Sequence, residues 1–458
     1  MNRSRWIQRH DVPGATDPAT GSLPRTAGWA VAGVAIAMAG LGALGGATAL
    51  AGADPGSPLP RAPTQPPVAQ FLDAAFGVAG QTDTEGFGGD RSAMALQSDG
   101  GIVMVGGTFT DFVMARYDAQ GRLDATFGEA GFVTTDMLPD EQEEAMAVAI
   151  APDGRIVVAG YSGFDATLAI ARYAPDGSLD ATFGDGGRVA GSVPGRGYAV
   201  AVQPDGAILV GGEAVRTDSA TDFSDLLLAR FQPDGTLDAG FGVDGVVVTD
   251  VNDGTNTLRN LVPLPDGTIV VSGEPFGDFE GSDHTDIARF GPAGQLDETF
   301  GTGGVLVLPG WLVGEGLAVQ ADGRLVLAGR SMDASGSTFA VMRLEGDGSP
   351  DATFGVGGLV TTDVGDQGDS ANAVAIGPDG RIVAAGRSGD INADFAAVRY
   401  LPDGSLDPTF ADAGTLTIDF HLFPDIAESV VIQPDGMTVL GGFVRQNVDG
   451  YGLARVLP

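Results

Sequence analysis

The sequence predicts an all-β protein, a seven-bladed β-propeller with four antiparallel strands in each blade. Three observations predict it. A Leu-Asp-x-x-Phe-Gly motif, an Asp-Gly turn before an apolar run, and an Arg that closes an apolar stretch each occur seven times along the chain. Short strands with regularly spaced turn signals are typical of a sandwich, a barrel or a propeller. Four strands in each of seven units favour the propeller, which is built by radial repetition of such sheets.

The three repeated features mark the same seven units. The Phe of the first motif recurs at intervals of 51 to 59 residues, with Pro350 in place of the Leu in one copy and Ala411 in place of the Gly in another. The seven motif positions are Phe76, Phe127, Phe183, Phe241, Phe300, Phe354 and Phe410. The Asp-Gly turns end at Gly100, Gly154, Gly206, Gly267, Gly323, Gly380 and Gly436.

Each unit contains four strand-like segments, and residues 145–190 serve as the example. An Ala-rich run (145–150) leads through a Pro-Asp-Gly turn into a β-branched run (155–160). A variable loop precedes the third strand (167–173), and a second Pro-Asp-Gly turn leads to the fourth strand near 188–190. We call these strands A to D. Small side chains fit where strands converge on an axis, so strand A is expected to be innermost.

The phase of the repeat predicts how the ring closes. The repeats begin with a D-type segment and end with a C-type strand at residues 451–456. Residues 78–84 are therefore expected to complete the last blade, formed by residues 426–457, because that pairing removes the open sheet edges.

The repeat also resembles a known family. Residues 145–184 and 373–410 closely match A-x-A-V-A-x-x-P-D-G-x-I-V-V-A-G followed by A-R-Y-x-P-D-G-S-L-D-x-T-F. This string resembles the delta-60 repeat of bacterial exported proteins, and the likeness extends over about residues 70–458. The resemblance implies a propeller-like tandem array and no established activity. The fourth unit matches least well, because Leu258-Arg259-Asn260 stands in its Ala-rich strand.

The N-terminal region has the layout of an export signal. Four Arg residues fall within the first 25 positions, an uncharged run extends from Ala27 to Ala53, and small residues end that run. Residues 1–53 are therefore expected to be a signal peptide or, if uncleaved, a membrane anchor. Residues 54–69 are rich in Pro and predict an extended linker, and residues 70–458 form the propeller. This layout predicts an extracytoplasmic protein, secreted, periplasmic or in the cell envelope.

Composition excludes several kinds of chemistry. The chain has 458 residues, no Cys and a formal net charge of −36, and all its basic residues other than His are Arg. Cysteine catalysis, cysteine zinc sites and Schiff-base lysines are excluded. The acidity predicts no nucleic-acid partner.

The repeated Arg and Asp are expected to be structural. An Arg–carboxylate pair near the turn between strands C and D would join the two segments. Seven equivalent copies favour that role over a ring of binding sites. The expected structural positions are Arg116, Arg172, Arg230, Arg289, Arg343, Arg399, Arg455, Asp73, Asp124, Asp180, Asp238, Asp297, Asp351 and Asp407.

The variable loops are the candidate binding positions. Loops between strands B and C and between strands D and A differ from copy to copy and share one face, and binding commonly uses variable loops on a rigid scaffold. The alternative is that these loops are only solvated. The candidate residues are Phe223, Phe276, Phe279, His284, Trp311, Phe420, His421 and Phe423.

Two classes of function follow. The first is a non-catalytic binding or scaffold module, expected to be a monomer, whose partner is a protein, a glycan or an envelope component. The alternative is a propeller hydrolase or lyase with a carboxylate-based site at the channel mouth. The sequence favours no enzyme, because it lacks a G-x-S-x-G elbow and has only His284 and His421 beyond the signal region. No cofactor is predicted. Ca²⁺ is a candidate only because the turns are rich in Asp, whose spacing is not that of a D-x-D-x-D-G loop.

Overall fold

The computed structural model describes residues 68–85, 92–108, 110–215, 224–251, 256–275, 284–309, 312–333, 336–365, 368–390, 392–420, 423–445 and 449–458. Within these residues the chain forms seven four-stranded antiparallel sheets and one short 3₁₀ helix, η1 (Val68–Gln70). The predicted seven-bladed all-β propeller is therefore confirmed. The expected signal peptide, anchor and most of the linker lie outside the described residues. No helix among the described residues is long and apolar enough to cross a membrane.

The first four blades follow the predicted strand order A-B-C-D. Blade one contains β2 (Ala93–Leu96), β3 (Ile102–Gly107), β4 (Phe112–Tyr117) and β5 (Phe132–Thr135). Blade two contains β6 (Glu143–Ile150), β7 (Ile156–Ser162), β8 (Thr167–Tyr173) and β9 (Arg188–Val189). Blade three contains β10 (Arg196–Val202), β11 (Ile208–Val215), β12 (Ser224–Phe231) and β13 (Val246–Thr249). Blade four contains β14 (Asn256–Pro263), β15 (Ile269–Pro275), β16 (Asp286–Phe290) and β17 (Val305–Val307).

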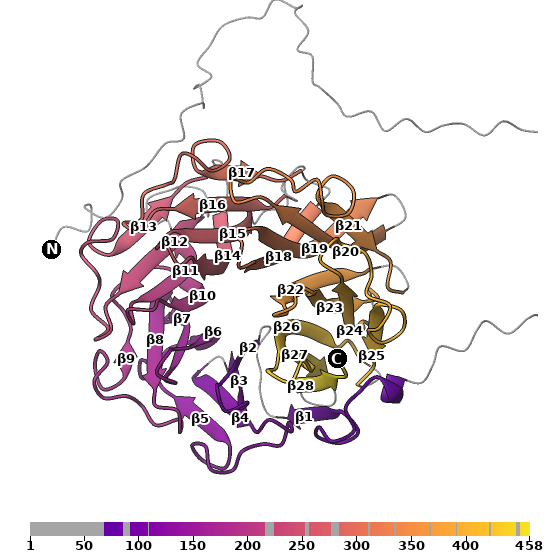
Figure 1. Cartoon of the computed structure of the whole chain (residues 1–458). Coiled ribbons are helices and arrows are strands. Elements are labelled where there is room, and N and C mark those ends of the chain that lie inside the picture. The colour runs from indigo at the N-terminus through magenta and orange to yellow at the C-terminus, as the bar shows by residue number, and fades with distance from the viewer. Residues whose placement is uncertain are drawn as a thin grey trace, which may run out of the picture. The chain divides into compact units, whose positions relative to one another are not determined.

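The last three blades complete the ring. Blade five contains β18 (Leu312–Val319), β19 (Leu325–Asp333), β20 (Gly336–Leu344) and β21 (Leu359–Thr362). Blade six contains β22 (Ser370–Ile376), β23 (Ile382–Ser388), β24 (Asp394–Tyr400) and β25 (Thr415–Ile418). Blade seven contains β26 (Ile426–Ile432), β27 (Thr438–Arg445), β28 (Asp449–Val456) and, as its outer strand, β1 (Gln81–Glu85). The A strands surround the centre of the ring (Figure 1), as their Ala content predicts.

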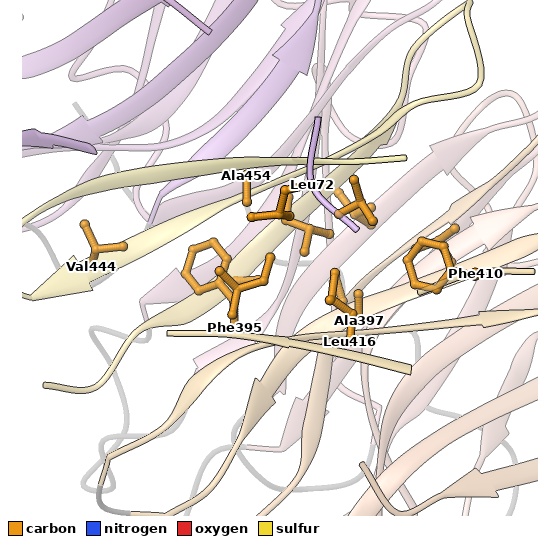
Figure 2. Close-up of a cluster of buried hydrophobic side chains, with 14 residues drawn as sticks. Leu72, Phe395, Ala397, Phe410, Leu416, Val444 and Ala454 are labelled. Atoms are coloured by element: carbon orange, nitrogen blue, oxygen red, sulfur yellow. The ribbon is translucent and has the colours of Figure 1, made fainter. Parts of the chain in front are cut away.

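The two ends of the chain close the ring in blade seven, as predicted. β1 pairs antiparallel with β28 from Gln81 opposite Ala454 to Glu85 opposite Gly450. Leu72 forms a further bridge with Val456. Figure 2 shows the core between blades six and seven, where Leu72 packs as part of one buried cluster. Other members of that cluster are Phe395, Ala397, Phe410, Leu416, Val444 and Ala454. The N-terminal segment therefore contributes both a strand and a core side chain to the last blade.

A bulge interrupts strand A in blades two to seven. In each of these blades the A–B register shifts by one residue, for example between Ala145 and Ala147 of β6. A bulge leaves one residue unpaired and re-aims its side chain. Strand B has a glycine opposite the bulge, where a side chain would clash with strand A. In blade two, for example, a Cβ on Gly160 would lie 1.9 Å from the carbonyl oxygen of Glu144. The residues at the bulge are Met146, Tyr198, Arg259, Glu315, Asn372 and Glu428. Only blades five and seven have the same residue type there.

Candidate functional site

The face that carries the A–B and C–D turns repeats one arrangement seven times. In each blade the Arg at the end of strand C lies 2.6 to 2.9 Å from the Asp that follows the C–D turn, with Arg455 reaching Asp73 across the closure of the ring. Each guanidinium also lies over the Phe of the repeated motif, 4.5 to 5.9 Å from the ring centroid. The structure thus brings together all fourteen positions expected to be structural. We call this surface the uniform face.

Several of these arginines also connect neighbouring blades. Arg172 of blade two donates from Nη1 to the carbonyl of Pro233 in blade three. Arg230 and Arg343 donate in the same way to Pro292 and Pro402, at 2.5 and 2.6 Å. One side chain therefore joins its own C–D turn, an aromatic ring and the next blade. These contacts agree with a structural role for the repeated arginine.

The opposite face, which carries the B–C and D–A loops, is called the variable face. Of the eight candidates predicted there, Phe223, Phe276, Phe279, Trp311 and His421 lie outside the described residues. Phe420 is partly buried, with its ring centroid 4.9 Å from that of Phe395, so it packs as a core residue. Phe423 is half exposed. His284 belongs to blade four, so the structure does not place these three candidates in one blade.

Three buried carboxylates on the variable face accept hydrogen bonds from the backbone of the D–A loops that precede them. Glu143 accepts a hydrogen bond from the backbone N–H of Met137 at 2.7 Å, Asp369 accepts one from Val364 at 2.7 Å, and Asp425 accepts one from Phe420 at 2.9 Å. All three occupy the same position before the strand A bulge. Backbone N–H donors satisfy a buried carboxylate, so these groups stabilise D–A loops.

Asp286 is an exception to the repeat. It lies opposite Gly273 in the register of strands B and C, where every other blade has a buried apolar residue or glycine. The equivalent residues are Val113, Ala169, Leu227, Ala340, Ala396 and Gly452. Asp286 is 8% exposed. A carboxylate at a position that the fold fills with apolar groups is costly, which points to a role other than packing.

His284 is the nearest ionisable neighbour of Asp286. Its Nε2 lies 3.6 Å from Asp286 Oδ1, and its side chain is 18% exposed. Burial raises the pKa of Asp286 to about 6, against the opposing effect of the His284 charge. Asp286 faces blade three, since it lines a cavity with Leu226 and Val251, and His284 lies two residues before it, just outside β16. The imidazole is the more exposed group of the pair.

A small cavity adjoins Asp286 between blades three and four. Its volume of about 10 Å³ is close to that of one water molecule. The polar residues that line it are Asn256, Thr257 and Asp286, and the apolar ones include Leu226 and Val251. The carboxyl group thus lies beside a small cavity at a blade junction, whereas the alternative interpretation of the sequence expected a carboxylate site at the channel mouth.

A cluster of Arg, Tyr and Glu side chains adjoins this cavity. Glu213 Oε1 accepts hydrogen bonds from Arg196 Nη1 at 2.7 Å and from the Tyr198 hydroxyl at 3.0 Å. Its Oε2 accepts one from the hydroxyl of Thr257 at 3.3 Å. The Arg259 guanidinium lies 4.7 Å from the centroid of the Tyr198 ring. Because Thr257 also lines the cavity, the cluster is continuous with Asp286.

The variable face holds no recognisable metal centre in the part of the chain that the structure describes. No group of three or more His, Asp or Glu side chains there could hold an ion. The Asp residues of the C–D segments, which suggested Ca²⁺, bond their own backbone: Asp176 Oδ1, for example, accepts from the N–H of Ser178 at 3.0 Å.

Sequence reasoning missed Asp286, Arg196, Tyr198 and Arg259. The signal for Asp286 is present in the sequence, since an alignment of the seven C strands shows one charge in an apolar column. Tyr198 and Arg259 are harder to find by sequence, because both are bulge residues. A strand with one inserted residue has the same sequence pattern as a strand that is one residue longer.

The comparisons with known proteins agree with the fold. Six segments match a family model described as a β-propeller domain of unknown function: residues 97–127, 151–183, 203–241, 264–300, 320–354 and 377–410. These segments correspond to the repeats identified above. The delta-60 name suggested by the resemblance is not itself part of that description. No curated protein matches the chain.

Many solved structures share the fold at low identity. A polysaccharide lyase of family PL25, an ulvan lyase bound to a glucuronate–rhamnose sulfate unit, is 12% identical, with a TM-score of 0.46 over 82% of this chain and 95% of that one. A second polysaccharide lyase is 11% identical, with a TM-score of 0.44 over 80% and 89%. A protein assigned to the gluconolactonases is 12% identical, with a TM-score of 0.36 over 86% and 96%.

The comparisons correct the prediction that the chain is not an enzyme. Chains with the propeller fold include polysaccharide lyases and a gluconolactonase assignment, so that prediction is wrong. It rested on missing nucleophile motifs and few histidines. Such motifs belong to other folds, and an acid–base pair needs only one imidazole and one carboxyl group.

Proposed function

We propose that the chain is an extracytoplasmic hydrolase or lyase that acts on a glycan at the junction of blades three and four on the variable face. The observation that carries this proposal is Asp286, a buried carboxyl group in a position that is apolar or glycine in the other six blades. His284, 3.6 Å away, is the group that meets the substrate. The part of the variable face beside this pair carries Tyr198 and the half-exposed Arg196, side chains that can contact a sugar ring and donate hydrogen bonds to it.

The acid–base pair has a defined part in either reaction. The protonated imidazole of His284 gives its proton to the leaving glycosidic oxygen as the carbon–oxygen bond breaks. In hydrolysis, water adds its hydroxyl to the other fragment and its proton returns to His284. In elimination, His284 starts neutral, takes a proton from the neighbouring carbon, and then gives that proton to the leaving oxygen. Asp286 orients the imidazole and balances its charge, as a carboxylate behind a catalytic histidine does.

The test is cleavage of purified extracytoplasmic polysaccharides, followed by release of reducing ends. Wild-type protein should cleave at least one polymer, and His284→Ala should lower the rate about 100-fold or more, as expected for a lost general acid. Asp286→Asn keeps the shape and should lower the rate while shifting the pH profile. Val356→Ser, a change at an exposed site between β20 and β21 on the uniform face, is the control and should leave the rate unchanged. Equal rates for wild type and His284→Ala would refute the proposal.

A further inference from the structure

Arg196 is a positioned guanidinium with an open edge. Its Nη1 donates to Glu213 at 2.7 Å, and its guanidinium lies 5.3 Å from the centroid of the Tyr161 ring. The side chain remains 38% exposed. Of its donors, only Nη1 has a partner among the described residues. The Nε and Nη2 donors of this half-exposed side chain thus have no partner among the described residues, and such a fork matches a carboxylate.

Basic residues are rare on the inner strands. Among the described residues of the seven A strands, Arg196 and Arg259 are the only basic side chains. They occur in adjacent blades, and each lies against a tyrosine ring, Tyr161 and Tyr198 respectively. A chain with a net charge of −36 repels anions at long range, but charges are screened beyond about 8 Å at physiological ionic strength. Direct contact with the arginines is therefore the means by which an anion would bind here.

Arg196 and the His284–Asp286 pair belong to one continuous surface. Glu213 holds Arg196 through Oε1 and contacts Thr257 through Oε2, and Thr257 lines the cavity beside Asp286. Arg196 is therefore linked to the acid–base pair through Glu213 and Thr257, across the junction of blades three and four.

We propose that the substrate is a uronic-acid-containing glycan whose carboxylate is bound by Arg196, with Arg259 adding positive charge. This inference rests on the proposed function and specifies its reaction as elimination. Pairing with arginine stabilises the negative charge that develops when the proton next to the sugar carboxylate is removed. That proton goes to neutral His284, its electron pair forms the carbon–carbon double bond, and the glycosidic bond breaks. The leaving oxygen then takes the proton from His284, so all atoms and charges balance without a co-reactant.

The test measures binding and product separately on the full chain. Oligosaccharides of galacturonate, mannuronate and glucuronate are titrated by calorimetry, each beside its carboxyl-reduced neutral counterpart. At least one acidic probe should bind 10-fold or more tightly than its counterpart. Arg196→Gln should remove that preference, and Arg196→Lys should restore it only partly. Arg188→Gln, at a partly exposed site on outer strand β9, is the control and should keep it. Thermal unfolding shows that each variant folds.

The outcomes separate this inference from the proposed function. Ultraviolet absorbance from the new double bond, lost in His284→Ala, supports both. Uronate binding that depends on Arg196 without any cleavage supports the ligand class and refutes the reaction. Cleavage of acidic and neutral polymers at equal rates, unchanged in Arg196→Gln, supports the hydrolase or lyase and overturns the uronate inference. No preference for any acidic probe also overturns it.

Discussion

The uniform and variable faces of the propeller are made by the same seven repeats, yet they differ in kind. On the uniform face, seven arginines meet seven carboxylates and seven phenylalanines in one geometry. On the variable face, equivalent positions hold unlike residues, as Asp286 and its six apolar or glycine counterparts show. A position that repeats is constrained by the fold in every blade. A position that departs from the repeat at a cost in stability is where a function is best sought.

The largest effect is expected from breaking the uniform face. Arg172→Ala leaves Asp180 with only the half-exposed Arg155 as an ionic partner, and it removes the link to Pro233 in the next blade. Losing the buried member of this ion pair, together with its contact with the Phe183 ring, should still cost about 3 kcal/mol or more, so the denaturant midpoint should fall. Arg188→Ala, on an outer strand, should cost less than about 1 kcal/mol. An unchanged midpoint for Arg172→Ala would show that the repeated pair does not hold the blades.

The second prediction is that a substitution on the variable face increases stability instead of decreasing it. Asp286→Ala installs the residue that blades two, five and six have at this position, and should stabilise the fold while abolishing activity. A carboxyl group whose folded pKa is raised to about 6 contributes stability at low pH that is lost as pH rises from about 4 to 6. Removing it should raise the free energy of unfolding at pH 7 by up to about 3 kcal/mol.

The measurement is the free energy of unfolding across that pH range. Wild type should lose stability between about pH 4 and 6, and Asp286→Ala should lose less. Both proteins should keep part of this pH dependence of the free energy of unfolding. Its source is Asp394, whose pKa is raised to about 6 by burial and by the charges of Asp419 and Asp425. Asp165→Ala, in an exposed turn, is the control. A destabilised Asp286→Ala variant would mean that the carboxyl group is structural.

The third prediction concerns acid. Hydrogen bonds from Thr353, together with Arg343, hold the pKa of Asp351 down to about 2. A depressed folded pKa contributes stability that is present above the unfolded value and lost as pH falls from about 4 to 2. For Asp351 the loss is about 2 kcal/mol. Acid titration of wild type should show this fall, and Asp351→Asn should show a shallower one. Equal slopes would contradict the predicted linkage.

The smallest effect is expected at an exposed loop residue of the variable face. Phe423 is 50% exposed, so Phe423→Ser should change the free energy of unfolding by no more than about 0.5 kcal/mol. Thermal unfolding checks it. A larger loss would show that this loop packs against something the exposed surface does not reveal.

The repeats made most of the fold predictable, because the same local signals occur seven times and any one copy tests the others. The pairing of residues 78–84 with the last blade followed from the phase of the repeat alone, and β1 confirms it. The candidate site was harder to predict. Asp286 and His284 lie in the blade with the weakest match, and Arg196 meets Glu213 only through strand register. Contacts of that kind depend on which face a side chain takes beside a bulge, which sequence spacing does not determine.

The closure of blade seven has a consequence for biogenesis. β1 is among the first ordered segments that the ribosome makes, and its partner β28 is the last. Six blades can form hairpin by hairpin as the chain emerges, but β1 must keep its hydrogen-bonding edge unsatisfied until the final residues appear. Closure of blade seven therefore waits until β28 has been made. A product truncated before β28 would retain an exposed strand edge, a ready target for proteases and chaperones.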